Sequence, residues 1–193
     1  EQNVAIINCC GFESIPPDIG VYYTLKQLKD KNPKINTFLK TKGKISGGTW
    51  ASFLNSFSSK KPIIKQGLNK SKKTKKIFYV KELKKWALIF PVIDKHIVKK
   101  SAKQLNYGEG FSFNEYILFN SIFRIIGLII SISFIGLIAK IKFFRNYLKT
   151  FIPSGTGPSK KERLNHWFEL KIFGNTKTEN IVTTVSGGDP GYG

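Results

Sequence analysis

Small polar side chains and a glycine follow the first apolar run of the chain, at residues 9–14. Residues 4–7 are unbroken valine, alanine and isoleucine, which predicts a strand covered on both faces. In open α/β sheets, ligands bind just beyond the carboxyl ends of the strands. We therefore expect a ligand site at this turn. The residues that would occupy it are Cys9, Cys10, Gly11, Phe12, Glu13 and Ser14.

A helix is predicted directly after this turn. Ser14 is a candidate N-cap, and Pro16 and Pro17 suit only the first turn of a helix. Asp18 places negative charge near the positive end of the helix dipole. Apolar side chains then recur at three- and four-residue spacing and predict one apolar face. That face consists of Ile15, Ile19, Tyr22, Leu25 and Leu28.

Two glycine-rich stretches offer further places where the backbone could approach a ligand. Residues 46–49, SGGT, follow a predicted strand at residues 35–45 and open a predicted helix that ends near Phe57. This helix start could contact an anion or a cofactor, or its glycines could serve the backbone angles of the turn. Residues 186–193, SGGDPGYG, indicate either tight turns or close approach to a ligand.

The remaining groups that could do chemistry are few. His96 is a candidate general acid or base, although a histidine without a visible partner is more often structural or exposed. Asp94 is a candidate cap for a helix at residues 95–105. Cys9 and Cys10 are adjacent, which makes a disulfide between them strained and fits a reducing compartment. No spacing typical of a metal site is present in the sequence.

Four motifs, in order, resemble the saccharopine dehydrogenase-like oxidoreductases, a family that includes trans-acting enoyl reductases. CCGFESIPPDIG at residues 9–20 resembles that family's CGFDSIPSDLG, with glutamate for aspartate and proline for serine. SGGT at residues 46–49 resembles its GGT, and residues 94–108 resemble its D-x-x-V-x-R-S-x-x-L-x-YG segment. Residues 187–193 resemble its closing GGDPGYG. The first and last motifs are specific, whereas the middle two would be weak alone.

This resemblance implies an α/β fold and a nicotinamide-dependent oxidoreductase. Residues 1–33 would be the tail of a Rossmann-type domain, and residues 34–193 a mixed or antiparallel sheet domain with helices that binds the substrate. The cofactor would be NAD or NADP, and the substrate lipid-like. The expected cofactor-binding residues are Cys10, Gly11, Phe12 and Ser14. Asp189 and Tyr192 are the expected catalytic residues, with Tyr192 as a proton donor.

A Gly-rich phosphate-binding turn, which a nicotinamide domain needs at a helix N-terminus, does not stand in this sequence. In the resembled family that element precedes the motif at residues 9–20. We therefore expect the chain to be a fragment that is inactive by itself and does not bind NAD(P)H tightly.

The most apolar segment is residues 116–144. Within it, residues 125–139 carry no charge and are apolar all round, but they are fewer than the ~20 residues that a spanning helix needs. Basic residues follow at once: Lys140, Lys142, Arg145 and Lys149. A buried core helix, a spanning helix, and a helix inserted into one leaflet or a lipid-droplet monolayer all remain open. The apolar character on every face favours membrane association, on the cytoplasmic face, or a lipid droplet.

The charge is strongly positive, with 32 Lys plus Arg against 12 Asp plus Glu and a net charge of +20. Almost all of the excess is lysine, whereas proteins that read bases favour arginine. Residues 60–85 are lysine-rich with few aromatic side chains, which predicts a solvated loop. Two alternatives to an oxidoreductase stay open: a non-catalytic lipid-surface scaffold of the same fold, and a basic nucleic-acid-binding module, suggested only by net charge.

The last part of the chain predicts a sheet. Residues 159–162, SKKE, are typical of a capping box that opens a short helix. Residues 166–173 and 180–185 have the residue alternation of strands and are joined by GNTKTEN, which predicts a β-hairpin.

Overall fold

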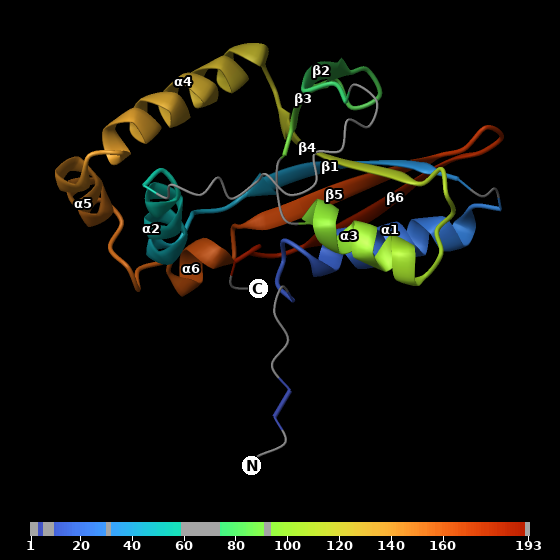
Figure 1. Ribbon diagram of the computed structural model, residues 1–193, viewed down its shortest axis with the longest axis horizontal. Helices are drawn as coiled ribbons and strands as arrows, with labels where there is room; N and C mark the ends of the chain where they lie inside the picture. Colours follow the sequence, from blue (N-terminus) through green and yellow to red (C-terminus); the bar gives the residue numbers. More distant parts are fainter. Residues whose placement is uncertain (1–3, 6–9, 30–31, 59–73, 91–93, 192–193) are drawn as a thin grey trace. The chain divides into compact units, whose positions relative to one another are not determined.

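The chain contains both helices and strands in a computed structural model that describes residues 4–5, 10–29, 32–58, 74–90 and 94–191 (Figure 1). The strands are β1 (Lys34–Lys42), β2 (Ile77–Val80), β3 (Lys85–Ile89), β4 (Ser112–Phe119), β5 (Trp167–Asn175) and β6 (Asn180–Gly187). The helices are α1 (Ile15–Gln27), α2 (Gly47–Ser56), α3 (Asp94–Gln104), α4 (Ile122–Ala139), α5 (Lys142–Thr150) and α6 (Lys160–Arg163).

The strands form a six-stranded sheet in the order β2-β3-β4-β1-β5-β6 (Figure 1). It is a mixed sheet, because β1 pairs with β4 in parallel and β5 pairs with β6 antiparallel. The predicted α/β class is therefore confirmed.

The chain divides into two compact units, and each is described by itself. Unit 1 comprises Glu1–Thr41, Ala87–Leu118 and Phe168–Gly187, and unit 2 comprises Lys42–Trp86, Phe119–Trp167 and Gly188–Gly193. The division after residue 33 into a cofactor domain and a substrate domain concerns the complete protein and stays a prediction.

The core of unit 1 lies between its strands and two helices, α1 and α3, which lie side by side (Figure 1). Apolar side chains from β1, β4 and β5 fill it together with one residue of each helix. The members of this core are Val21, Ile35, Leu39, Val98, Phe113, Leu170 and Ile172.

Helix α1 buries a different face from the one that its apolar spacing predicts. Its buried residues are Pro17, Gly20, Val21 and Thr24. Ile15, Ile19 and Tyr22 of the predicted face are 41%, 57% and 40% exposed, so that part of the prediction is wrong. A Cβ on Gly20 would overlap the Ile172 side chain and come within 3.0 Å of Val185, so the missing side chain lets α1 lie close to β5 and β6.

The strand predicted at residues 4–7 is wrong for Val4 and Ala5, which are exposed and outside any strand, and residues 6–7 lie outside the described residues. A strand's backbone groups need a neighbouring strand. Val4 and Ala5 belong to none of the six strands of the sheet.

The predicted hairpin at the end of the chain is confirmed. β5 and β6 pair from Phe168 opposite Gly187 to Asn175 opposite Asn180. The predicted solvated loop at residues 60–85 is wrong at its end, where β2 and β3 stand in adjacent positions of the sheet. Lysine dominates the composition of residues 60–85, and the apolar run IFYV of β2 is too short to predict a strand within it.

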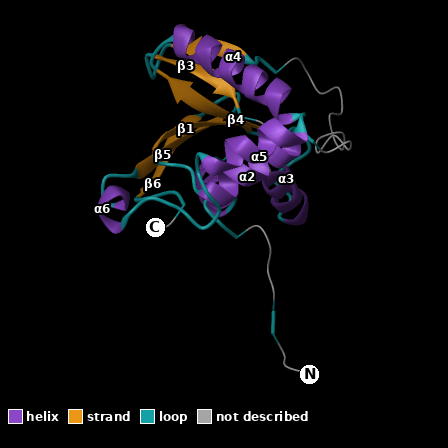
Figure 2. Cartoon of the chain, turned by 90° about the vertical axis from the view of Figure 1, so that its left-hand side faces the viewer, coloured by secondary structure: helices purple, strands orange, loops and turns teal. Residues whose placement is uncertain are grey.

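Helices α2, α4 and α5 of unit 2 pack against one another, as Figure 2 shows. α2 begins where the sequence predicts, with Ser46 as its N-cap. The indole N–H of Trp50 donates to the backbone oxygen of Leu148 in α5 at 2.7 Å. Gly136 of α4 lies so close to the ring of Phe57 that a Cβ there would come within 2.6 Å of it. Aromatic side chains after the SGGT motif thus contact α4 and α5.

Candidate functional site

The turn before α1 holds the predicted cofactor-binding residues in unit 1. Cys10 and Gly11 are exposed, Phe12 is half-buried, and Ser14 is buried. The ring of Phe12 packs edge-to-face against that of Phe168, with 4.6 Å between the centroids. A Cβ on Gly11 would meet no atom within 4 Å, so the space beside this glycine is open.

The backbone N–H groups at the start of α1 are already used. Those of Ser14 and Ile15 donate to the Gly11 oxygen at 3.0 Å, and that of Asp18 donates to the Ser14 oxygen at 3.1 Å. The two residues between them are prolines and carry no N–H. A phosphate binds at a helix start through free N–H groups. The first turn of α1 therefore does not fit the phosphates of a dinucleotide, whereas the side of the turn at Gly11 is open.

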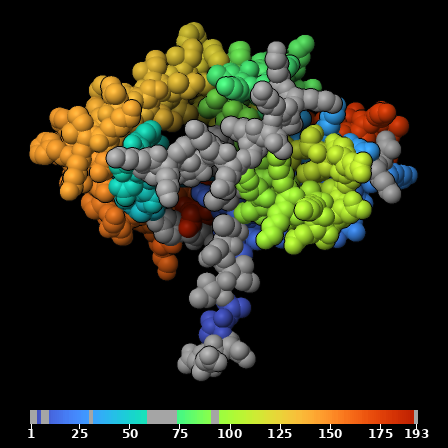
Figure 3. All heavy atoms as spheres, viewed as in Figure 1, coloured from blue at the N-terminus to red at the C-terminus, as the bar shows by residue number. Residues whose placement is uncertain are grey.

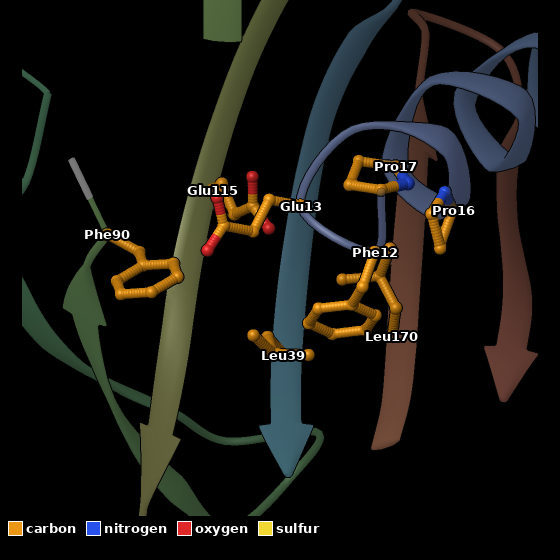
Figure 4. A pocket seen from close by; sticks show the side chains of 8 residues that line it. All are labelled: Phe12, Glu13, Pro16, Pro17, Leu39, Phe90, Glu115 and Leu170. Atoms are coloured by element: carbon orange, nitrogen blue, oxygen red, sulfur yellow. The ribbon is translucent and has the colours of Figure 1, made fainter. Parts of the chain in front are cut away.

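A small pocket lies behind the turn, and Figure 4 shows the side chains that line it. It encloses about 20 Å³, room for about one water molecule and not for an aromatic ring. Glu13 and Glu115 both line it, and Glu115 is only 4% exposed (Figure 4). Sequence reasoning missed Glu115, because β4 lies at the start of the apolar segment and its single acidic residue gives no motif.

Ser14→Ala should leave the free energy of unfolding unchanged to within about 0.5 kcal/mol. Ser14 occupies the N-cap position of α1, but its side chain makes no capping hydrogen bond. Ser46 is the matched control, because its Oγ accepts from the Thr49 N–H at 3.1 Å. Ser46→Ala should therefore lower the free energy of unfolding by about 1 kcal/mol. Urea denaturation of both variants measures the difference.

An equal loss of stability for both serine variants would contradict this account of Ser14. A loss of NADPH affinity in the complete protein, with stability unchanged, would indicate that Ser14 contacts the cofactor directly.

A hydrogen bond between α1 and α3 joins the motif at residues 9–20 to the motif at residues 94–108. The Ser101 hydroxyl donates to Oδ2 of Asp18 at 2.8 Å. Burial raises the pKa of the nearby Tyr107 phenol to about 12, with smaller contributions from Asp18 and Tyr22. Asp18, predicted only to favour the helix dipole, thus also ties the two helices together. His96 lies exposed on α3, as expected of a histidine without a partner.

The glycines at the start of α2 serve close backbone packing. The Gly47 N–H donates to the Thr156 oxygen at 2.9 Å, and a Cβ on Gly47 would overlap the Pro153 oxygen. The Thr49 N–H is bonded to the Ser46 side chain. Residues 153–156 of unit 2 therefore cover this helix start. Neither Gly47 nor Gly48 has a positive φ, so the predicted need for special backbone angles is wrong, and Gly47 is required instead for close packing against Pro153.

Asp189 of the closing motif lies in unit 2 and forms a buried pair with His166. Its Oδ2 is hydrogen-bonded to Nδ1 of His166, and its Oδ1 accepts from the Gly191 N–H at 2.8 Å. Sequence reasoning missed His166, because the two residues are far apart in the chain and no motif joins them. Tyr192, the predicted proton donor, lies outside the described residues.

An open groove of about 480 Å³ lies in unit 2. Its walls include Gly43, Lys44, Ile45, Ile152, Pro158 and Glu162. Lys44 and Glu162 form an ion pair at its edge. The hydrogen bond from Lys44, and then those from Ser159, lower the pKa of the Glu162 carboxyl to about 2. The same bonds to Ser159 complete the predicted capping box of α6.

Helix α4 is not a buried core helix. It is long and apolar enough to cross a membrane by length and composition, yet only 17% of it is buried. The space-filling view in Figure 3 shows α4 and α5, in yellow to orange, at the surface. Its exposed large side chains are Phe123, Ile126, Leu128, Ile129, Ile130, Ile132, Phe134 and Leu137. The segment predicted at residues 116–144 starts earlier than this helix, because residues 116–119 belong to β4.

The basic segment after α4 forms the amphipathic helix α5. Its exposed aromatic side chains are Phe143, Phe144 and Tyr147, and Phe151 follows directly. Lys142, Arg145 and Lys149 lie on the same helix. Nη1 of Arg145 donates to the Ala139 oxygen at 3.0 Å and so ties α5 to the end of α4. Helix α5 therefore presents apolar side chains together with cations, a composition typical of helices at lipid surfaces.

Curated proteins named saccharopine dehydrogenase-like oxidoreductase are similar to this chain over its whole length. The rat protein is 27% identical over 230 aligned residues, and the human and bovine proteins are 26% identical. The alignments cover 100% of this chain and 53% of each relative, so the chain spans about half the length of the curated relatives that it matches. No family model and no solved structure matches the chain. The resemblance predicted from the motifs is confirmed.

Proposed function

We propose that the complete protein, a homologue of the saccharopine dehydrogenase-like oxidoreductases, is a nicotinamide-dependent reductase that acts on a lipid-like substrate at a membrane or lipid-droplet surface. The observation that carries this proposal is the exposed apolar helix α4 in a chain related to proteins of that name over its whole length. An enzyme held on a lipid surface meets substrates that are themselves insoluble in water.

The turn before α1 supplies the ring contacts of the cofactor in this proposal. Cys10 and Gly11 border the open side of the turn, and Phe12 and Ser14 support it from within. A bound nicotinamide supplies the hydride. Its phosphates bind elsewhere in the complete protein, because the first turn of α1 keeps no free N–H for them.

Helix α4 lies along the lipid surface in this proposal rather than across it. One side of it is held by the protein, through Ile125, Gly136 and Ala139, and Gly136 is covered by Phe57. The other sides enter the acyl chains, while the cations of α5 remain among the headgroups. The net charge of +20 favours anionic lipids of the cytoplasmic leaflet.

A second candidate is a lipid-surface scaffold without catalysis. It is favoured by the small pocket at the turn, about 20 Å³, and by the missing phosphate donors at α1. Both candidate functions require binding to a lipid surface, so a measurement of cofactor binding distinguishes between them.

The test uses the complete protein with phosphatidylserine-containing vesicles that carry a medium-chain α,β-unsaturated acyl thioester. NADH and NADPH are each added, and the loss of nicotinamide absorbance is followed. We expect cofactor oxidation that depends on both the thioester and the vesicles. Vesicle binding without any change in nicotinamide fluorescence would contradict the reductase and support the scaffold.

A further inference from the structure

The open groove of unit 2 has walls that hydrogen bonds hold in place. One wall follows β1, and the other joins α5 to α6. The Gly47 N–H at the start of α2 donates to the Thr156 oxygen of this second wall at 2.9 Å. The indole N–H of Trp50, also on α2, donates to the Leu148 oxygen in α5 at 2.7 Å. Helix α2 thus holds the second wall near its beginning and near its end, and the groove is formed without a ligand, as most ligand sites are.

The groove combines apolar side chains with one ion pair. Ile45, Ile152 and Pro158 lie in its walls. Lys44 and Glu162 also line it and pair with each other. Their side chains are 64% and 41% exposed, so both charges remain within reach of a ligand. The groove therefore offers apolar contacts and, beside them, one positive and one negative charge.

The ion pair determines which charged group fits the groove. The hydrogen bond from Lys44, and then those from Ser159, lower the pKa of Glu162 to about 2, so this carboxylate is charged at neutral pH. A fatty acid anion would be attracted by Lys44 and repelled by Glu162, and these two effects oppose each other. A zwitterion with a phosphate and an ammonium group matches both charges, because each of its groups meets one of the opposite sign.

Helix α5 ends beside this groove. Phe151 directly follows the helix, and its side chain is 64% exposed. The next residue, Ile152, lines the groove. Consecutive Cα atoms are only about 3.8 Å apart. In the proposed function α5 lies at a lipid surface, so the groove begins where this lipid-facing helix ends.

We propose that the groove binds one molecule of a zwitterionic phospholipid, with its phosphate at Lys44, its ammonium group at Glu162 and the start of an acyl chain along Ile45 and Ile152. The volume of about 480 Å³ suits a headgroup and the first part of one chain, since sites for small ligands measure ~300–1,000 Å³. The inference rests on the lipid surface of the proposed function and not on its reductase activity.

Photolabelling of the complete protein tests this site. The protein is bound to phosphatidylglycerol vesicles that contain a small share of phosphatidylethanolamine with a diazirine near the start of one acyl chain. Phosphatidic acid with the same diazirine chain is the matched probe, because it keeps the phosphate and lacks the ammonium group. After illumination, mass spectrometry of the peptides measures the label on residues 43–45 and 152–158 relative to the label on α4.

We expect this ratio to be about tenfold higher for phosphatidylethanolamine than for phosphatidic acid, because only the former can donate to Glu162. Lys44→Gln should lower the groove label from phosphatidylethanolamine by about tenfold, since it removes the partner of the phosphate. Lys160→Gln is the matched control. It removes the same charge from an exposed position on α6 that does not line the groove, and should leave the ratio unchanged.

Ile45→Trp is a second variant, which fills the groove from an exposed position and should keep the fold. We expect it to abolish the groove label from both probes while cosedimentation with the vesicles stays as in the wild type. Groove label that persists in this variant, or equal label ratios from both probes, would overturn the proposed site.

Label on α4 without label in the groove would also overturn it, and would show that another part of the complete protein fills the groove. The lipid surface of the proposed function would stand in that case. A wild type that does not sediment with vesicles would overturn the lipid surface itself, and this site with it. Oxidation of NADPH by the complete protein is measured separately and tests the reductase alone.

Discussion

Replacing Ile130 and Phe134 by lysine should release the complete protein from phospholipid vesicles while leaving it folded. Both side chains are 63% exposed, and they lie one turn apart on the same face of α4. Removing two such apolar groups from acyl chains costs about 4 kcal/mol, which is roughly a thousandfold in the partition coefficient. Cosedimentation with phosphatidylserine-containing vesicles measures the change.

Ile125→Lys is the matched control, because it adds the same charge to the same helix at a position that is 0% exposed. A lysine there is buried without a partner and should unfold unit 2 rather than release it. Thermal unfolding of the soluble protein separates the two effects. A wild type that remains in solution beside vesicles, or a double variant that unfolds as Ile125→Lys does, would contradict the lipid surface.

Only part of the exposed apolar surface of α4 and α5 could be predicted from the sequence. The run of uncharged apolar residues in α4 is visible in the sequence, and so are the cations of α5 that follow it. Which side of α4 the protein covers is decided by packing, through Gly136 and the ring of Phe57, and these residues are far apart in the chain. Membrane association could therefore be predicted from the sequence. The sequence could not show that Ile130 and Phe134 are exposed and that Ile125 is buried, which is what the substitutions require.

Three local predictions are confirmed where a short-range rule decides the structure, although the side chain of Ser14 makes no capping hydrogen bond. The capping box of α6 forms between Ser159 and Glu162, and the hairpin of β5 and β6 forms around its polar connection. Both depend on residues a few positions apart, so the sequence states them directly. The start of α2 at Ser46 is of the same kind.

Long-range packing overruled the local pattern in α1. The spacing of Ile15 and Ile19 predicts a buried face, but Gly20 on another face allows closer contact with β5 and β6. The pairing of His166 with Asp189 is also long-range, over 23 positions. Residues 10–14 of unit 1 and Asp189 of unit 2 could therefore each be predicted as part of a motif, but the partners that surround each of them could not.

Replacing each of the two glycines of the SGGT motif by alanine should change the free energy of unfolding in opposite directions. Gly47→Ala should lower the free energy of unfolding by about 3 kcal/mol, because its Cβ would overlap the Pro153 oxygen, a backbone atom that cannot swing aside. Gly48→Ala is the matched control. Its Cβ would lie 3.7 Å from the nearest side chain, Ser46 Oγ, so alanine should raise the stability by about 0.5 kcal/mol through its better helix propensity.

Neither glycine has a positive φ, so the two substitutions differ in the space around the Cβ and not in backbone strain. Urea denaturation of both variants measures the difference in the free energy of unfolding. If Gly47 instead kept the helix start open for an anion, Gly47→Ala would leave unfolding unchanged and weaken NADPH binding by the complete protein. A stability loss in Gly47→Ala alone would establish that this motif joins α2 to residues 153–156 rather than binding an anion.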